Sequence, residues 1–205
     1  MDHLERYMVA AGRHRAEQSI QRSRFICTLE RVRDAGEAQA FVRAMNVEFA
    51  DATHNCWAYV AGAPGSTNVV GMSDDGEPHG TAGRPMLTVL LHSGIGEIAA
   101  VVTRYYGGTK LGTGGLVKAY GGTVQLALES VPQVERVDYV NVSVSIAYPS
   151  ITAIQQAIAE LGADVVEENY GVDVCYRLRV PRSRVDELSV IVANATRGEG
   201  TFRLE

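Results

Sequence analysis

Hydrophobic and polar residues alternate most regularly in the last third of the chain. Val140, Val142, Val144 and Ile146 are separated by single polar residues, which is the period of a half-buried strand. Elsewhere in this part, apolar residues recur every three or four positions, which predicts helices. The predicted order is strand, helix, strand, strand, helix, strand, over residues 140–146, 151–161, 163–168, 172–180, 185–192 and 201–204.

This order predicts a ferredoxin-like βαββαβ sandwich, with both helices on one face of an antiparallel sheet. We expect Ser150 to cap the first helix and Gly162 to end it, and Ser183 with Asp186 resembles a capping box for the second. The other sheet face is open, and alternation predicts that it carries Asn141, Ser143, Ser145, Arg177, Arg179 and Arg203. This polar, locally basic face is a candidate platform for RNA, although it lacks stacking aromatic residues. The alternatives are a solvated face and a face packed against the other domain.

The preceding part of the chain has a less regular pattern, which predicts three helices on one sheet. Asp34 and Glu37 are typical of a helix start, and Phe41, Met45 and Phe49 recur on one face of that helix. The other predicted elements are a meander of strands at 7–10, 15–20 and 24–29, a hairpin of 56–61 with 69–72, a polar loop at 73–85, a helix over 86–92, a strand at 98–103, and a helix from Thr113 with Val117, Tyr120, Val124 and Leu128 on one stripe.

Composition and length are those of an ordinary globular protein. The 205 residues are 46% hydrophobic and 21% charged, which argues against a disordered, collagen-like or coiled-coil chain. Pro132 follows the last helical pattern of the first part, and we place two domains there, 1–135 and 136–205. No apolar run is long enough to span a membrane, and residues 1–15 carry charges of both signs. We therefore expect a cytoplasmic protein that does not associate with membranes.

Cysteine content and charge narrow the chemistry further. Cys27, Cys56 and Cys175 lie far apart, which predicts reduced thiols rather than a disulfide framework or a zinc site. The net charge of -5 and the pI near 5.6 argue against binding nucleic acid through bulk charge. Residues 138–205 contain six Lys and Arg against ten Asp and Glu, so the second domain is the more acidic. A local basic patch is compatible with this balance.

Three polar segments depart from the pattern that folding alone requires: residues 52–59, 73–85 and 103–116. In the third, a strand leads through a glycine-rich loop into a helix. Such a loop presents backbone N–H groups and the positive end of a helix to phosphate, and Arg104 and Lys110 would add charge. The spacing matches neither the nucleotide P-loop nor the dinucleotide fingerprint. The alternative is that the glycines serve positive φ angles and close helix packing.

The second segment contains groups that could bind a metal. Asp74, Asp75, Glu77 and His79 lie close together in sequence, and His54 could approach from another segment. Their spacing fits no recognised metal loop, and adjacent carboxylates more often cap turns and helix N-termini. The chain also lacks a Gly-x-Ser-x-Gly elbow. We therefore predict no metal and no cofactor, and we assign no catalytic residue.

The same three segments carry a resemblance to a known family. In order along the chain they resemble signature segments of the IMPACT family, in its bacterial YigZ-type form. The resemblance covers the first domain from about Ser23 to Ser130, and the second domain looks like the small C-terminal domain of bacterial members. His79 and Lys118 depart from the family pattern. The matching segments are Ala52-Thr-His-Asn-Cys56, Asp74-Asp-Gly-Glu-Pro78, Gly80-Thr-Ala-Gly83, Arg104-Tyr-Tyr-Gly-Gly108 continuing to Gly115, and Ala119-Tyr120.

The resemblance implies a fold and a general function. The first domain is expected to be the α/β sandwich with a left-handed crossover that a small-subunit ribosomal protein, GHMP-type sugar kinases and the fourth domain of elongation factor G share. Sequence reasoning alone would rank that crossover as improbable. The second domain is expected to resemble the fifth domain of elongation factor G. Eukaryotic relatives restrain a starvation-activated kinase of a translation initiation factor by competing for its activator. Bacteria lack that partner, so only a link to translation or RNA carries over.

The leading hypothesis is a non-enzymatic binding protein whose anionic ligand is RNA or a ribosomal surface. One alternative is an enzyme acting on a phosphorylated small molecule, by analogy with the sugar kinases, although no small-molecule substrate is identified. Another is a regulator that binds a protein partner in translation control. The predicted anion-binding residues are His54, Arg84, Arg104, Gly107, Gly108, Lys110, Gly112, Gly114, Gly115, Arg177, Arg179 and Arg203. The predicted loop-organising residues are Asn55, Asp74, Asp75 and Glu77.

Overall fold

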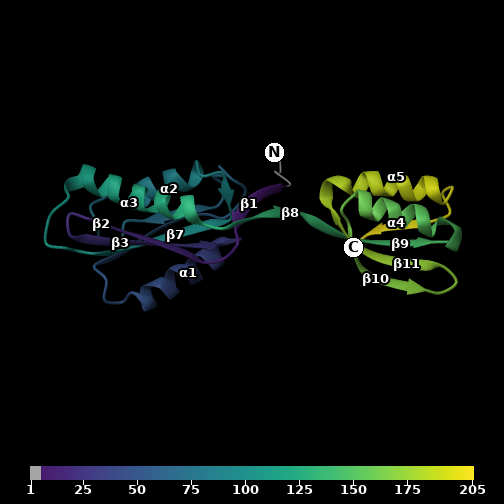
Figure 1. Ribbon diagram of the computed structural model, residues 1–205, viewed down its shortest axis with the longest axis horizontal. Coiled ribbons are helices and arrows are strands. Elements are labelled where there is room, and N and C mark those ends of the chain that lie inside the picture. The colour runs from purple at the N-terminus through teal and green to yellow at the C-terminus, as the bar shows by residue number, and fades with distance from the viewer. Residues whose placement is uncertain (1–5) are drawn as a thin grey trace. The chain divides into compact units, whose positions relative to one another are not determined.

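Antiparallel pairing of five strands builds the central sheet of the N-terminal part of the protein (Figure 1). The computed structural model describes residues 6–205 and divides the chain into two units, Met1–Arg136 and Val137–Glu205. The first five residues, on which part of the expectation about the N-terminus rests, lie outside the described residues. Across residues 6–205, no helix is both long and apolar enough to cross a membrane. The protein is therefore a mixed α/β chain of two units with several sheets.

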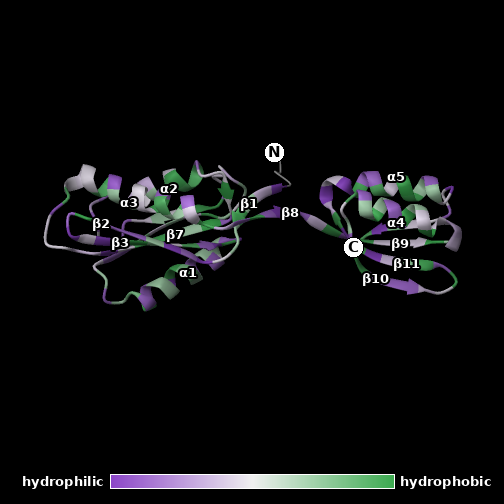
Figure 2. Cartoon of the chain, in the orientation of Figure 1, coloured by the Kyte–Doolittle hydropathy of each residue, from purple (hydrophilic) through white to green (hydrophobic). Residues whose placement is uncertain are grey.

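The five-stranded sheet places the strand β7 (Ile98–Tyr105) at its centre. The strand order is β2 (His14–Ile20), β3 (Ser23–Arg31), β7, β4 (His54–Val60) and β5 (Val70–Ser73). β7 is buried along its length until Tyr105, because helices cover both faces of the sheet, and Figure 2 shows this strand as largely hydrophobic. The register sets Arg104 opposite Phe25 on β3 and opposite His54 on β4. The predicted hairpin of β4 with β5 is confirmed.

Helices lie on both faces of this sheet (Figure 1). α1 (Ala35–Glu48) packs Phe41 and Met45 against one face. α2 (Gly83–Leu91) and α3 (Gly112–Ser130) cover the other face, where Met86, Leu90 and Tyr120 are fully buried. β3 and β4 run parallel on either side of β7 and are connected through α1. The sheet and three helices thus form three layers.

Two expectations about the first unit were wrong. The first predicted strand, β1 (Arg6–Ala10), does not join the β2–β3 hairpin but pairs in parallel with β6 (Ile95–Gly96), in a small sheet with β8 (Gln133–Val137). Its partner is distant in sequence, so no local pattern could show the pairing. On α3, Val117 was expected on the buried stripe, but 40% of its surface is exposed. Tyr120 and Val124 are buried as predicted.

The second unit has the predicted order of elements. Val142, Val144, Tyr176 and Leu178 face the two helices and are buried. The antiparallel sheet has the order β10, β11, β9, β12. The elements in chain order are β9 (Tyr139–Ile146), α4 (Ile151–Glu160), β10 (Asp164–Tyr170), β11 (Val174–Pro181), α5 (Val185–Ala195) and β12 (Thr201–Leu204).

The two predicted caps of this unit are absent. Ser150 has helical φ and ψ angles and its hydroxyl donates to the carbonyl of Ala195, whereas a side-chain cap needs an extended residue. A short 3-10 turn, Arg182–Arg184, precedes α5, and Arg184 takes the capping position without a side-chain hydrogen bond. The end of α4 is as predicted, because Gly162 follows it with a φ of +63°.

Helix α1 allows a test of whether its local capping residue stabilises the start of the helix. The Asp34 carboxylate accepts a hydrogen bond from the Glu37 amide at 2.8 Å, as the predicted capping motif requires. We expect Asp34→Ala to lower the free energy of unfolding by about 1 kcal/mol, because one amide loses its acceptor. Asp34→Ser keeps an acceptor and should stay close to wild type. Urea denaturation of the three proteins measures the difference, and equal loss in both variants would contradict the capping role.

Candidate functional site

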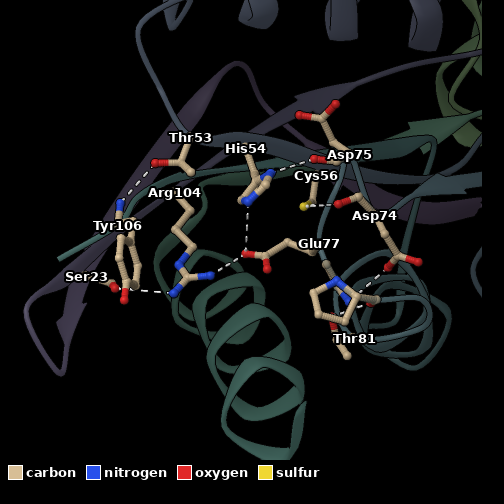
Figure 3. A network of polar contacts seen from close by, with 12 residues as sticks. Ser23, Thr53, His54, Cys56, Asp74, Asp75, Glu77, Thr81, Arg104 and Tyr106 are labelled. Atoms are coloured by element: carbon tan, nitrogen blue, oxygen red, sulfur yellow. Dashed lines mark hydrogen bonds and ion pairs between the residues drawn. The ribbon is translucent and has the colours of Figure 1, made fainter. Parts of the chain in front are cut away.

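Three sequence segments that are distant along the chain meet at one end of the central sheet (Figure 3). His54 starts β4, Arg104 lies near the end of β7, and their pairing in the sheet brings them together. The loop after β5 then places Glu77 beside both side chains. The structure therefore brings together members of all three polar segments.

A buried ion pair occupies the centre of this network. One terminal nitrogen of Arg104 donates to Glu77 Oε1 at 2.5 Å, and the hydroxyl of Tyr120 donates to the same oxygen at 2.8 Å. Arg104 is 5% exposed and Glu77 8% exposed. The second terminal nitrogen of Arg104 donates to Ser23 Oγ at 3.4 Å. The expectation that Arg104 contacts phosphate directly needs correction, because its charge is buried and neutralised by Glu77.

The Arg104 guanidinium also lies close to two aromatic rings. Its central carbon is 5.4 Å from the ring centroid of Phe25 and 5.4 Å from that of Tyr106. Both distances are within the range of cation–π attraction. The Nε atom of Arg104 is buried and has no hydrogen-bond partner among the described residues. Since an unpartnered buried donor is costly, the other contacts must hold this side chain in place.

His54 is more exposed than the ion pair beneath it, with 22% of its side chain accessible to solvent. Its Nδ1 atom lies 2.7 Å from the carbonyl oxygen of Asp75. A carbonyl can only accept, so Nδ1 carries the hydrogen, and Nε2 faces Glu77 Oε1 at 4.0 Å. His54 is thus fixed in orientation by the loop and lies over the ion pair.

The Asp74 carboxylate organises the loop that leads into α2. It accepts hydrogen bonds from the backbone amides of Gly80, Ala82 and Gly83 at 2.8 to 3.0 Å. Burial alone raises the pKa of Asp74, but these three amide donors outweigh it, and the exposed His79 also favours the charged form, so the pKa lies below its ordinary value. Asp74 therefore does for α2 what a capping residue does for other helices.

Asp75 and Asn55 connect this loop to the sheet. The Asp75 carboxylate accepts from the Asn55 amide at 2.6 Å. The Asn55 side chain accepts from the Thr103 hydroxyl at 2.7 Å and donates to the carbonyl of Phe49 at 3.2 Å. Asn55 is buried and Asp75 is exposed, and the contacts between them hold the loop against the sheet.

The two buried groups with potential reactivity are held in their neutral forms. Burial raises the pKa of the Cys56 thiol, which donates to the carbonyl of Asp74 at 2.9 Å. Burial also raises the pKa of the Tyr120 hydroxyl. A reactive cysteine needs a lowered pKa and access to solvent, and Cys56 has neither. Within residues 6–205, no three His, Cys, Asp or Glu side chains are grouped so that they could bind a metal ion.

The glycine-rich loop joins β7 to α3 and differs sharply between its two ends. At its start, a Cβ on Gly107 would lie 2.0 Å from the backbone of Arg22, so only glycine fits. Gly108 and Gly112 have positive φ angles and open space around them. α3 begins without a side-chain cap, and Lys110 just before it is exposed. The loop is thus anchored at Gly107 and open beyond it, and Gly114 and Gly115 extend this small-residue stretch into the first turn of α3.

Four exposed cations surround this loop and the helices that follow it. Arg22, Arg84, Lys110 and Lys118 are exposed, and none forms an ion pair with another part of residues 6–205. α2 contains no acidic residue, and α3 contains only Glu129 near its C-terminal end. Arg84 and Lys118 line a shallow groove of about 470 Å³ between the two helices, together with Gly80. We call these four residues the α3 cation group.

The open sheet face of the second unit has a different charge environment. Arg177 pairs with Glu167 and Glu205, and Arg179 pairs with Asp164 at 2.6 Å. Arg203 lines a polar hollow of about 460 Å³ that also contains Ser143, Ser145 and the exposed Cys175. The face is polar as expected, but its basic character is largely neutralised by the acidic strands beside it. The assignment of Arg177, Arg179 and Arg203 to an anion site stays a prediction.

Several residues of the site were missed from the sequence. Ser23, Thr53 and Tyr120 contact the network, and none of them was among the predicted site residues. Thr53 and Tyr120 do lie in segments that carry the family resemblance, which was the available signal, whereas Ser23 had none. The sequence does not show that Arg22 and Lys118 form no ion pair within residues 6–205, because this depends on which acidic residues the fold brings near them. For Lys118 a signal was present, because it lies on a helix that has no acidic residue in its first turn.

Comparisons with known proteins agree with this division into two parts. Residues 21–128 match the Impact N-terminal domain, and residues 144–199 match the domain of unknown function DUF1949. The chain is 40% identical to the IMPACT family member YigZ of Escherichia coli over 95% of this chain and 96% of that protein. It is 38% identical to the IMPACT family member YvyE of Bacillus subtilis over 94% of this chain and 87% of that one. A crystal structure of a hypothetical protein, 40% identical, superposes with a TM-score of 0.70 over 97% of both chains.

The Asp74 cap predicts a pH-dependent contribution to stability. Because the folded state lowers the pKa of Asp74, its carboxylate stabilises the fold above the ordinary carboxyl pKa of about 4, and this contribution is lost as the pH falls through the lowered value. We expect Asp74→Asn to cost about 2 kcal/mol at neutral pH and progressively less below pH 4. Urea denaturation at several pH values measures this, with the exposed Asp173→Asn as a control. A cost that does not change with pH would contradict the charged cap.

We expect alanine substitutions at Gly107, in the loop, and at Gly114, in the first turn of α3, to change stability in opposite directions. Gly107→Ala should cost about 1–3 kcal/mol, because its methyl group would overlap the Arg22 backbone. Gly114→Ala should stabilise by about 0.5–1 kcal/mol, because its site is open and helical. Thermal unfolding of both variants measures the sign. Equal tolerance at both positions would show that Gly107 is not tightly packed.

Proposed function

The chain belongs to the IMPACT family, and on that premise we propose that it is a non-enzymatic cytoplasmic binding protein that contacts RNA phosphates through the α3 cation group. The link to RNA or to translation comes from the family resemblance. The place of contact comes from the charge arrangement of the first unit. The observation that carries the proposal is the set of four exposed cations that form no ion pair within residues 6–205, around one loop of a chain whose net charge is -5.

The start of α3 supports phosphate binding in a second way. Its first amides have no side-chain acceptor, and the helix dipole gives this end a partial positive charge. Gly108, Gly112 and Gly114 leave space for a phosphate to approach the backbone closely. Lys110 adds a full charge beside these amides. In this proposal the polar network stabilises the conformation of the loop from the inside of the fold. Its members are His54, Arg104 and the carboxylates of Asp74, Asp75 and Glu77.

The strand orders support the finer fold assignments that the resemblance implies. The order β10, β11, β9, β12 with two helices on one face favours a ferredoxin-like second unit, similar to the fifth domain of elongation factor G. The parallel pair β3 and β4 on either side of β7, connected through α1, is compatible with the sandwich of ribosomal proteins and GHMP-type kinases. Related folds in translation proteins favour RNA or the ribosome as the binding surface, although fold alone is weak evidence for function.

The enzymatic alternative has less support from the site. A phosphoryl-transfer site needs carboxylates that can hold magnesium near the phosphates. Asp74 is engaged by three backbone amides, and Glu77 by Arg104 and Tyr120. We therefore favour binding over catalysis. A protein partner in translation control would use the same exposed surface and is an outcome of the experiment below.

We expect the double variant Lys110→Gln/Lys118→Gln to bind structured RNA more weakly and with a smaller salt dependence. Each lost phosphate contact reduces the slope of log affinity against log salt by about one, because fewer counterions are released. Filter binding at several salt concentrations measures the slope.

The matched control is Arg43→Gln/Arg197→Gln, which removes two exposed cations from α1 and from the second unit. It changes net charge equally and should leave the slope unchanged. Equal slopes for wild type and both double variants would remove the α3 cation group as the RNA contact. If wild type shows no salt-sensitive binding to RNA, the proposed function itself falls, and a protein partner becomes the better candidate.

A further inference from the structure

Tyr106 is an exposed aromatic residue at the edge of the polar network. It is 46% exposed, although Arg104 beside it is almost completely buried. Figure 3 shows the guanidinium of Arg104 on one side of the Tyr106 ring, at the 5.4 Å distance given above. Tyr106 is therefore an aromatic ring supported by a cation, with much of its surface open to solvent.

The backbone on both sides of this ring is fixed. The Tyr106 amide donates to Thr53 Oγ1 at 3.1 Å, and the Gly107 amide donates to Ser23 Oγ at 3.2 Å. Gly107 is packed directly against the backbone of Arg22. The ring is thus positioned before any ligand arrives, which lowers the entropy cost of stacking.

The support beneath the ring is equally fixed. Glu77 and Ser23 hold the two terminal nitrogens of Arg104, and the ring centroid of Phe25 lies 5.4 Å from its guanidinium carbon. Because the charge of Arg104 is neutralised by Glu77, this side chain does not serve as a phosphate ligand. It acts as a positioning residue that holds Tyr106 in place.

We propose that Tyr106 stacks on an unpaired base, so that the RNA recognised by this protein is single-stranded at the point of contact. The inference rests on the proposed function and specifies its ligand. Nucleobases stack on aromatic side chains only where the base is free of its helix, and a duplex does not expose that surface. Lys110 lies four residues after Tyr106, and the backbone of Arg22 lies against Gly107, so two exposed cations belong to the segments next to the ring and are candidates for the flanking phosphates.

This arrangement accounts for a feature that phosphate binding alone does not explain. A loop that only bound phosphate would use amides and cations and would make no use of an aromatic ring. Stacking gives the exposed ring a function. It also makes the buried Arg104–Glu77 pair a support for the ring, in addition to a link between distant segments.

The test compares an unstructured oligouridine that carries one fluorescent purine with a duplex of the same length. We expect wild type to bind the single strand more tightly than the duplex and to quench the purine. Tyr106→Ala should weaken single-strand binding by about tenfold and abolish quenching, while the salt slope stays that of wild type. Tyr106→Phe keeps the ring and should behave as wild type. Thermal unfolding of each variant establishes that it is folded.

The outcomes separate this inference from the proposed function. If Tyr106→Ala binds the single strand as tightly as wild type, while Lys110→Gln/Lys118→Gln is weakened, the stacking role is wrong and phosphate binding stands. If wild type prefers the duplex or binds both forms equally, the single-strand inference is likewise wrong. If wild type binds neither form in a salt-sensitive manner, the proposed function and the inference both fall.

Discussion

The Arg104–Glu77 pair places two opposite charges inside the first unit, where each alone would be costly. Their burial is tolerated because the pair is bonded directly and because Tyr120 and Ser23 contribute further hydrogen bonds from other elements, although the Nε atom of Arg104 has no partner among the described residues. Glu77 comes from a loop, Tyr120 from α3 and Ser23 from β3, so one interaction joins segments that are far apart in sequence. Removing either charge would leave the other buried and unpaired, at a cost of about 3–5 kcal/mol.

This internal network determines what the outer surface can present. Because Glu77 neutralises the charge of Arg104, the positive charge available to a ligand comes from cations that form no ion pair within residues 6–205, above all Lys110 and Lys118. Because the same pair holds the end of β7, the loop that follows starts at a fixed point, with Tyr106 and Gly107 anchored by hydroxyl groups. The surface is therefore a consequence of the buried contacts: rigid at the aromatic ring, open at the glycines, and positively charged around both.

Local patterns were sufficient where the physical cause is local. Alternation along residues 140–146 predicts β9 because side chains of a half-buried strand alternate between core and solvent, and Asp34 predicts the start of α1 because its carboxylate bonds an amide three residues on. The pairing of β1 with β6 and the burial of Arg104 depend on partners that are distant in the chain. Ser150 does not cap α4 because its own backbone is helical. The open sheet face was expected to be basic, but Arg177 pairs with Glu167, which lies on a neighbouring strand that the alternation along β11 does not reveal. The segments of the candidate site were visible, but the division between buried and exposed charges was not.

The most direct measurement is a nuclear magnetic resonance titration of the isotope-labelled full chain with single-stranded RNA, in which the shifts of the backbone amides are followed. We predict that the largest changes fall on Tyr106 to Lys118 and on Arg22, and that α1 and the strands of the second unit stay unchanged. Changes confined to the open sheet face of the second unit, or no saturable change at all, would contradict the account.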